Sequence, residues 1–204
     1  MKILIAIPTL DYVHVDFMKS LLALNETIEC PHEISIQSGT LVYMAREKLA
    51  NKAINEGFDF VLWLDSDMVF QPTLLEDLQF SRKDFITGVY QARRPGFTSC
   101  IFEKIDLDSF RSVERYPSDI FRVEGCGFGC VLIKTEILKH VMQTYKTCFM
   151  PIEGYGEDIA FCLRARDLGY KLYCDPHVVC GHIGHVTIFP EDRETYLARM
   201  EAMQ

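Results

Sequence analysis

The sequence lacks a long hydrophobic run. Its apolar stretches stay well below the roughly 20 residues that a membrane-spanning helix needs, so we expect no membrane span. The first residues, MKILIAIPTL, hold one lysine and an early proline, and no cleavage pattern of a signal peptide follows them. Without an export signal, the eight cysteines are expected to be reduced thiols, and we predict a cytoplasmic protein.

Positive charge is also scarce. The 204 residues include 21 lysines and arginines against 29 aspartates and glutamates, which gives a net charge of -8. A nucleic-acid backbone is therefore not expected as the main partner, because phosphate binding requires a basic face. An anionic ligand would need a cation or a local basic cluster. Internal repeats and low-complexity linkers are missing too, and the length favours a single domain over residues 1–204.

Short apolar runs alternate with helical patterns through the first half of the chain. Strands are expected at residues 3–7, 33–37, 58–64 and 85–90, and the clearest helix at residues 40–57. Further helices are predicted from about residue 135 and over residues 157–169. Strands joined by helices indicate a mostly parallel central sheet with helices on both faces, which is an α/β fold. Beyond residue 95 the pattern becomes irregular, and antiparallel additions are expected in the C-terminal half.

Two carboxylates follow the most hydrophobic strand. In LWLDSDMVF, Asp65 and Asp67 stand where a parallel strand ends, the place where open α/β sheets bind ligands. In extended backbone their side chains share a face and repel each other unless a cation neutralises them. Mg²⁺ or Mn²⁺, held by one or two carboxylates and by substrate phosphates, would serve that purpose. The alternative is a pair of turn aspartates that cap local backbone.

A second acidic pair stands at a helix start. In GYGEDIAFCLRARDLG, Glu157 and Asp158 follow Gly156 and precede a helix with one apolar face. Acidic residues in a first helical turn are stabilised by the helix dipole, which also favours the ionised carboxylate. The functional alternative is that one of them is a general base held rigidly beside a substrate.

Cysteines and histidines gather near the end of the chain. CDPHVVCGHIGH contains possible zinc ligands, namely Cys174, His177, Cys180, His182 and His185. The two cysteines do not have the spacing of a zinc knuckle, and KLYCDPHVVC has the pattern of a strand with a turn. A single metal-binding histidine, His182 or His185, is the simpler expectation.

Together these segments resemble the glycosyltransferases of the GT-A fold, closest to the family-two-like group and its relatives among mannan-synthesis and polypeptide sugar transferases. IAIPTLDYVHVDF resembles the nucleotide-binding first strand and loop, and LWLDSDM resembles the D-x-D strand. The glycine-containing segment on the acceptor side of that family resembles EGCGFGCVLIKTEIL. Its acidic helix start with a distal histidine resembles GEDIAFCLRARDLGYKLYCDPHVVCGHIG. The order and spacing of the set are more specific than any one motif.

The resemblance implies a GT-A-like, Rossmann-like domain with a nucleotide-binding part at residues 1–95 and an acceptor-side part at residues 96–204. It implies Mn²⁺ or Mg²⁺, a nucleotide-diphosphate sugar as donor with UDP favoured, and a glycan, lipid-linked or protein acceptor. The residues that it assigns are Pro8, Thr9, Asp11, Arg46, Asp65 and Ser66 at the nucleotide, Asp65, Asp67 and His182 at the metal, and Asp158 with Glu157 at the reacting acceptor.

Several positions leave alternatives open. Arg46 matches an arginine that relatives follow with asparagine, whereas Glu47 follows it here; Arg46 could steady the D-x-D loop or the diphosphate, or be a solvated helix residue. Arg93 and Arg94 could reach phosphates, line the acceptor cleft or form a solvated turn. The glycines of GCGFG suggest close backbone approach to a sugar.

Other function classes are a zinc-organised interaction module without catalysis and a sugar nucleotidyltransferase. The latter would usually carry a glycine-rich basic loop after the first strand, which PTLDYVHVDF does not provide. The sugar, the stereochemical outcome and the oligomeric state are left open by the sequence.

Overall fold

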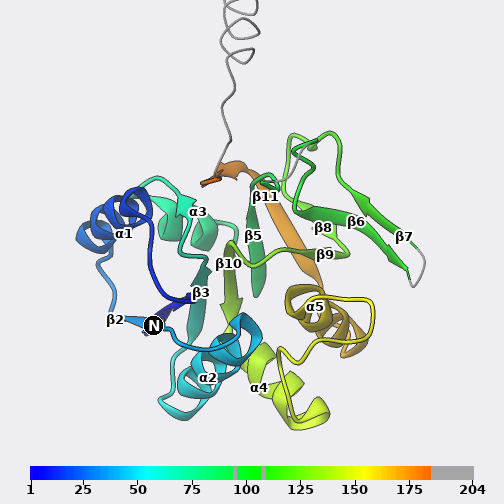
Figure 1. Ribbon diagram of the computed structural model, residues 1–204, viewed down its shortest axis with the longest axis horizontal. Helices are drawn as coiled ribbons and strands as arrows, with labels where there is room; N and C mark the ends of the chain where they lie inside the picture. Colours follow the sequence, from blue (N-terminus) through cyan, green and yellow to red (C-terminus); the bar gives the residue numbers. More distant parts are fainter. Residues whose placement is uncertain (94–95, 107–108, 185–204) are drawn as a thin grey trace, which may run out of the picture.

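The computed structural model describes residues 1–93, 96–106 and 109–184 (Figure 1). Its central sheet has seven strands in the order β2-β1-β3-β10-β5-β11-β8. The bounds of these strands are β1 Ile3–Pro8, β2 His32–Gln37, β3 Phe60–Leu64, β5 Phe85–Val89, β8 Phe121–Val123, β10 Cys130–Lys134 and β11 Leu172–Val179. The helices are α1 Val15–Thr27, α2 Val42–Asn55, α3 Leu74–Phe80, α4 Thr135–Tyr145 and α5 Glu157–Asp167.

Five of the seven strands run in one direction. Parallel pairing joins β1 to β2, β1 to β3, and β5 to β11, whereas β10 and β8 run against their neighbours. The antiparallel β10 lies between β3 and β5, so the C-terminal half of the chain supplies a strand inside the N-terminal sheet. The predicted α/β class, with a mostly parallel sheet and antiparallel additions in the C-terminal half, is confirmed.

Helices cover both faces of the sheet, as Figure 1 shows. On one face α2, α4 and α5 pack over a core that includes Trp63, Phe128 and Phe161, and on the other α1 and α3 pack over Ile5 and Leu62. Every residue of β1 is buried, as expected for a strand that is covered on both faces.

Two smaller sheets flank the central sheet. Strands β6 (Ile101–Asp106), β7 (Ser109–Ser112) and β9 (Gly125–Cys126) form a three-stranded antiparallel sheet that projects beside α5 (Figure 1). Strands β4 (Met68–Val69) and β12 (Gly181–His182) form a two-stranded antiparallel ladder. This ladder joins the segment after the D-x-D motif to the segment that carries His182.

The element boundaries differ from expectation mainly at β11. KLYCDPHVVC was expected to be a strand with a turn, but residues 172–179 form one strand. The irregularity is a shift of register against β5 between Cys174 and Val179, in the stretch that contains Pro176, which cannot donate to the ladder. Among the described residues, no helix is long and apolar enough to cross a membrane.

Candidate active site at the carboxyl ends of the strands

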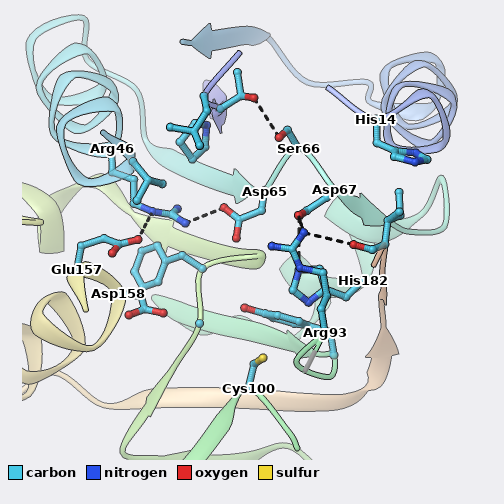
Figure 2. A pocket seen from close by; sticks show the side chains of 18 of the residues that line it. His14, Arg46, Asp65, Ser66, Asp67, Arg93, Cys100, Glu157, Asp158 and His182 are labelled. Carbon is cyan, nitrogen blue, oxygen red and sulfur yellow. Dashed lines mark hydrogen bonds and ion pairs between the residues drawn. The ribbon is translucent and has the colours of Figure 1, made fainter. Parts of the chain in front are cut away.

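A cavity of about 520 Å³ opens where the parallel strands end. Pro8 ends β1, Asp65 follows β3, Tyr90 follows β5, and His182 lies shortly after β11, and all four line this cavity. Glu157 and Asp158, at the N-terminus of α5, line another side of the cavity (Figure 2). The volume lies within the range of small-molecule sites, and the position is where open α/β sheets bind ligands.

Every residue that the resemblance assigned lines this one cavity. Those residues are Pro8, Thr9, Asp11, Arg46, Asp65, Ser66, Asp67, Glu157, Asp158 and His182. Arg93 lines it as well, whereas Cys174, His177 and Cys180 do not. Arg94 and His185 lie outside the described residues.

The loop after β1 is tied to the D-x-D loop. Ser66 Oγ donates to Thr9 Oγ1 at 3.2 Å, and Thr9 Oγ1 donates to the carbonyl of Tyr12 at 2.6 Å. The backbone N–H of His14 donates to the carbonyl of Ser66 at 3.1 Å. These three hydrogen bonds therefore fix the wall of the cavity that the loops after β1 and β3 form.

Arg46 connects the two acidic pairs. From α2 its guanidinium donates to Asp65 Oδ1 at 2.7 Å and to Glu157 Oε1 at 3.4 Å, as Figure 2 shows. The side chain lies beside the rings of Trp63 and Phe128 and is only 2% exposed, which excludes the alternative of a solvated helix residue. Burial alone would lower the pKa of Arg46, but the carboxylates, Asp65 first, leave it raised.

Glu47, which stands where the family that the sequence resembles has asparagine, binds a backbone segment outside the cavity. Its carboxylate accepts hydrogen bonds from the backbone N–H groups of Cys148 at 3.0 Å and Phe149 at 2.8 Å. Arg164 donates to the carbonyls of Cys148 and Met150 at 2.9 and 2.7 Å. Glu47 and Arg164 thus hold the segment that leads from α4 towards the acidic start of α5.

The pKa of Asp158 differs from that of an ordinary aspartate. Burial, and then the neighbouring charge of Glu157, raises its pKa to about 6, against a smaller lowering effect of Arg46. The helix start was expected to favour the ionised carboxylate, but desolvation by burial outweighs that effect and leaves the pKa raised. A carboxylate with a pKa near 6 is still mostly ionised at neutral pH and is a better proton acceptor than an ordinary one.

Asp67 and His182 contact each other in the wall of the cavity. Asp67 Oδ1 lies 3.5 Å from His182 Nε2, and Asp67 Oδ2 lies 2.5 Å from the guanidinium of Arg93. The β4–β12 ladder sets this approach, since the N–H of Ile183 donates to the carbonyl of Asp67 at 2.8 Å. Burial lowers the pKa of His182, but Asp67 and the carbonyl of Gln91 outweigh it and leave the pKa raised.

The tautomer of His182 follows from its second contact. Nδ1 lies 2.8 Å from the carbonyl oxygen of Gln91, which can only accept, so Nδ1 carries a proton. In the neutral imidazole, the lone pair of Nε2 then faces the carboxylate of Asp67. A proton or a metal cation between the two relieves this repulsion, and a histidine ligand held by a backbone carbonyl through its other nitrogen is usual in metal sites.

The pair therefore fits a divalent cation, with Arg93 as the cation that contacts Asp67 in this structure. Asp65 is turned towards Arg46 rather than towards His182 (Figure 2). In the described part of the chain, no three side chains among histidine, cysteine, aspartate and glutamate converge as a complete metal site. Substrate phosphate oxygens would have to complete the coordination of a cation that Asp67 and His182 hold.

Tyr90 lines the cavity too, and no motif in the sequence pointed to it. Its buried ring lies edge-on to His182, with centroids 5.5 Å apart, and its hydroxyl accepts a hydrogen bond from the N–H of Gly129 at 2.9 Å. A Cβ at Gly127 would overlap the hydroxyl of Tyr90, and one at Gly129 would lie 2.8 Å from its Cζ. Gly127 and Gly129 of GCGFG thus make room for Tyr90, and Gly125 makes room for Ile105. This packing explains the three glycines without the expected close approach to a sugar.

Comparison with known sequences finds no matching family and no matching characterised protein. Solved structures do match. The protein A197 from STIV has a TM-score of 0.64 at 20% identity, over 90% of this chain and 86% of that one. GalNAc-T7, solved with UDP, GalNAc and Mn²⁺, has a TM-score of 0.58 at 11% identity, over 93% of this chain but only 45% of that one. These likenesses show the fold, which is GT-A-like.

Proposed function

We propose that this protein is a metal-dependent glycosyltransferase that moves a sugar from a nucleotide-diphosphate donor, with UDP favoured, to a hydroxyl group of an acceptor. The observation that carries the proposal is the Asp67–His182 pair, a carboxylate and a correctly oriented imidazole 3.5 Å apart at the carboxyl ends of the strands. The structural likeness to GalNAc-T7, solved with UDP, GalNAc and Mn²⁺, supports the same class at the level of the fold.

The nucleotide would lie over the ends of β1 and β3. Pro8, Thr9 and Asp11 line the cavity there, and Ser66 is fixed to Thr9 by a hydrogen bond. Asp65 is held by Arg46, so its remaining oxygen atom is oriented for a ribose hydroxyl or for the metal. This side of the cavity is rigid before a ligand arrives, which lowers the entropy cost of binding.

The diphosphate would lie between Asp67, His182 and Arg93. Bound Mn²⁺ or Mg²⁺ would supply Lewis-acid stabilisation of the charge that develops on the leaving nucleoside diphosphate. Arg93 is free to exchange its contact with Asp67 for a phosphate oxygen, because its side chain is 48% exposed. The protein thus offers a second positive group to the departing diphosphate.

The acceptor would enter from the side of α5. Asp158 is the proposed base that takes the proton of the acceptor hydroxyl, and its pKa of about 6 suits that task at neutral pH. Glu157, bound to Arg46, would orient the acceptor or Asp158 itself. We propose a single displacement with inversion, in which the acceptor oxygen bonds to the anomeric carbon as the bond to the diphosphate breaks.

A thermal-shift screen of nucleoside diphosphates, each with and without Mn²⁺, tests the proposal. A ligand that binds only the folded state raises the midpoint of unfolding by mass action, so UDP with Mn²⁺ should raise it more than either alone. Tightly held zinc in the purified protein, with no response to any nucleotide, would support the zinc-organised interaction module instead and reject the transferase.

A further inference from the structure

A strip of aromatic side chains leads from the cavity to the surface beside Asp158. Phe102 on β6 lines the cavity and contacts Phe110 on β7, with ring centroids 5.8 Å apart. Phe110 in turn contacts Tyr155, with centroids 5.3 Å apart. We call Phe102, Phe110 and Tyr155 the aromatic strip. It is continuous with the cavity and belongs to the acceptor half of the chain.

The strip is partly open to solvent. Phe110, its middle ring, is 47% exposed although it touches a ring on either side. Ile152, which forms an isolated bridge with Tyr155, is 38% exposed. A large apolar surface that remains exposed beside a polar cavity marks a binding surface more often than a packing fault. The hydroxyl of Tyr155 makes no hydrogen bond within the described part of the chain, so it is available to a ligand.

The chain places this strip close to the proposed base. Tyr155 precedes Glu157 and Asp158 by two and three residues, and the bridge between Ile152 and Tyr155 closes the turn that contains Gly154. On the other side, Ile105 of β6 occupies the space beside Gly125, close to Ile159 of α5, which docks the β6–β7 hairpin on that helix. A ligand on the strip would therefore reach the acidic helix start.

We propose that the aromatic strip is the acceptor subsite and that the acceptor is a carbohydrate. This inference rests on the proposed sugar transfer, and it adds the class of the acceptor. A pyranose has one face of C–H groups, which packs on the negatively charged face of an aromatic ring, and a rim of hydroxyl groups. The rings of the strip can contact the C–H face. Glu157, Asp158 and the Tyr155 hydroxyl can form hydrogen bonds with the hydroxyl groups of the rim.

The surroundings favour a sugar over the other acceptor classes. A lipid chain calls for a long aliphatic groove, whereas this surface is a short series of rings that ends at two carboxylates. Carboxylates also repel the headgroups of anionic lipids. A peptide could pair with the outer edge of β7, but that pairing would leave the rings and the acidic pair without partners.

Saturation-transfer NMR on the full chain can test this directly, using cellobiose, lactose and methyl pyranosides as probes. Saturation is expected to reach the ring C–H protons of at least one saccharide. Phe110→Ala should weaken that binding by about fivefold to tenfold, Phe110→Tyr should preserve it, and Tyr155→Phe should weaken it by less than Phe110→Ala. Phe80→Ala removes an equally large ring, 87% exposed on α3, and should change nothing.

Titration of UDP with Mn²⁺ on the same samples separates this inference from the proposed function. Unchanged nucleotide affinity in Phe110→Ala shows that the donor side is intact and that the loss is specific to the strip. Saccharide binding that depends on Phe110, in a protein that binds no nucleotide, would reject the transferase and retain the carbohydrate site. Saccharide signals that are absent, or equal in the parent and Phe110→Ala, would overturn the inference. Binding of an unstructured peptide or of phosphatidylcholine vesicles in place of saccharides would overturn it as well.

Discussion

Arg46 and Asp65 meet 2.7 Å apart although they come from opposite sides of the site, one from α2 and the other from the end of β3. Arg46 also contacts Glu157 and lowers the pKa of Asp158, so a single buried cation acts on three carboxylates, one after β3 and two at the start of α5. Its effects are therefore expected in the pH dependence of the reaction more than in the fold.

Arg46→Met tests this control. Methionine keeps apolar contact with Trp63 and Phe128 but removes the charge that lowers the pKa of Asp158. The pH at which sugar transfer reaches half its maximum should rise above that of the parent protein. Arg111→Met removes an exposed arginine paired with Glu103 and should leave the profile unchanged. Overlapping pH profiles of Arg46→Met and the parent would contradict the assignment.

Asp158→Asn removes the proposed base while preserving size. Transfer should fall by about 10²–10⁴-fold, and the affinity for the nucleotide should stay nearly unchanged, which turnover assays and calorimetry can measure on one sample. Near-normal transfer by the variant would reject the role. A product with the anomeric configuration of the donor would reject the single displacement even if the variant were inactive.

The same substitution has a signature in stability. The folded state holds the proton of Asp158 up to a pKa of about 6, whereas the unfolded chain releases it near 3.8. As pH rises from about 4 to about 6, the parent protein therefore loses the stabilisation that the protonated Asp158 contributes. The contribution stays absent at higher pH. The midpoint of thermal unfolding of Asp158→Asn relative to the parent should rise across this window and stay level above it.

Asp67→Ala is expected to abolish the enhancement of nucleotide binding by Mn²⁺ and to leave the fold intact. The side chain is 24% exposed and its deletion opens no cavity in the core, so the free energy of unfolding should change by about 1 kcal/mol or less. Calorimetric titration of UDP with and without Mn²⁺ measures the effect. Asp119→Ala, a matched exposed carboxylate outside the cavity, serves as control. Unchanged affinities for UDP and Mn²⁺ in Asp67→Ala would remove Asp67 from the metal site.

Protonation of His182 is expected to make metal binding depend on pH. The imidazole binds a cation only when Nε2 is unprotonated, and its contact with Asp67 raises its pKa above the usual value near 6.5. Affinity for Mn²⁺ should therefore begin to weaken as pH falls through a range above 6.5. His182→Ala should lose Mn²⁺-dependent turnover, whereas His177→Ala, whose ring contacts the carbonyl of Ser118, should retain it. Full turnover by His182→Ala would refute the ligand role.

Much of the fold was predictable because its signals are local. Fully apolar runs such as residues 3–7 are typical of strands covered on both faces, and the segments between them have helical spacing. The position of β10 between β3 and β5 was not predictable. Its sequence, CVLIK, is apolar up to its final lysine and would suit any buried position in the sheet, so it does not specify its neighbours. Register depends on which strands meet, and that is decided by packing across the whole chain.

The site divides in the same way. Asp65, Asp67, Asp158 and His182 could be selected because their residue types and order resemble a family pattern, and the structure brings all of them to one cavity. Tyr90 and the Glu47 carboxylate could not be selected. Their roles depend on partners 39 and 101 residues away, Gly129 and Cys148, which no local pattern encodes. The pKa of Asp158 escaped prediction because it depends on burial.

The place of β10 also bears on how this chain could be divided or recombined. A fragment of residues 1–95 would contain β3 and β5 but not the strand between them, so both would present unpaired apolar edges. Two fragments cut near residue 95 should be insoluble apart and recover structure only when produced together. Exchange of the C-terminal half between proteins of this fold would have to keep CVLIK matched to the β3 and β5 of its host. Segments outside the central sheet, such as the β6–β7 hairpin, are free of that constraint.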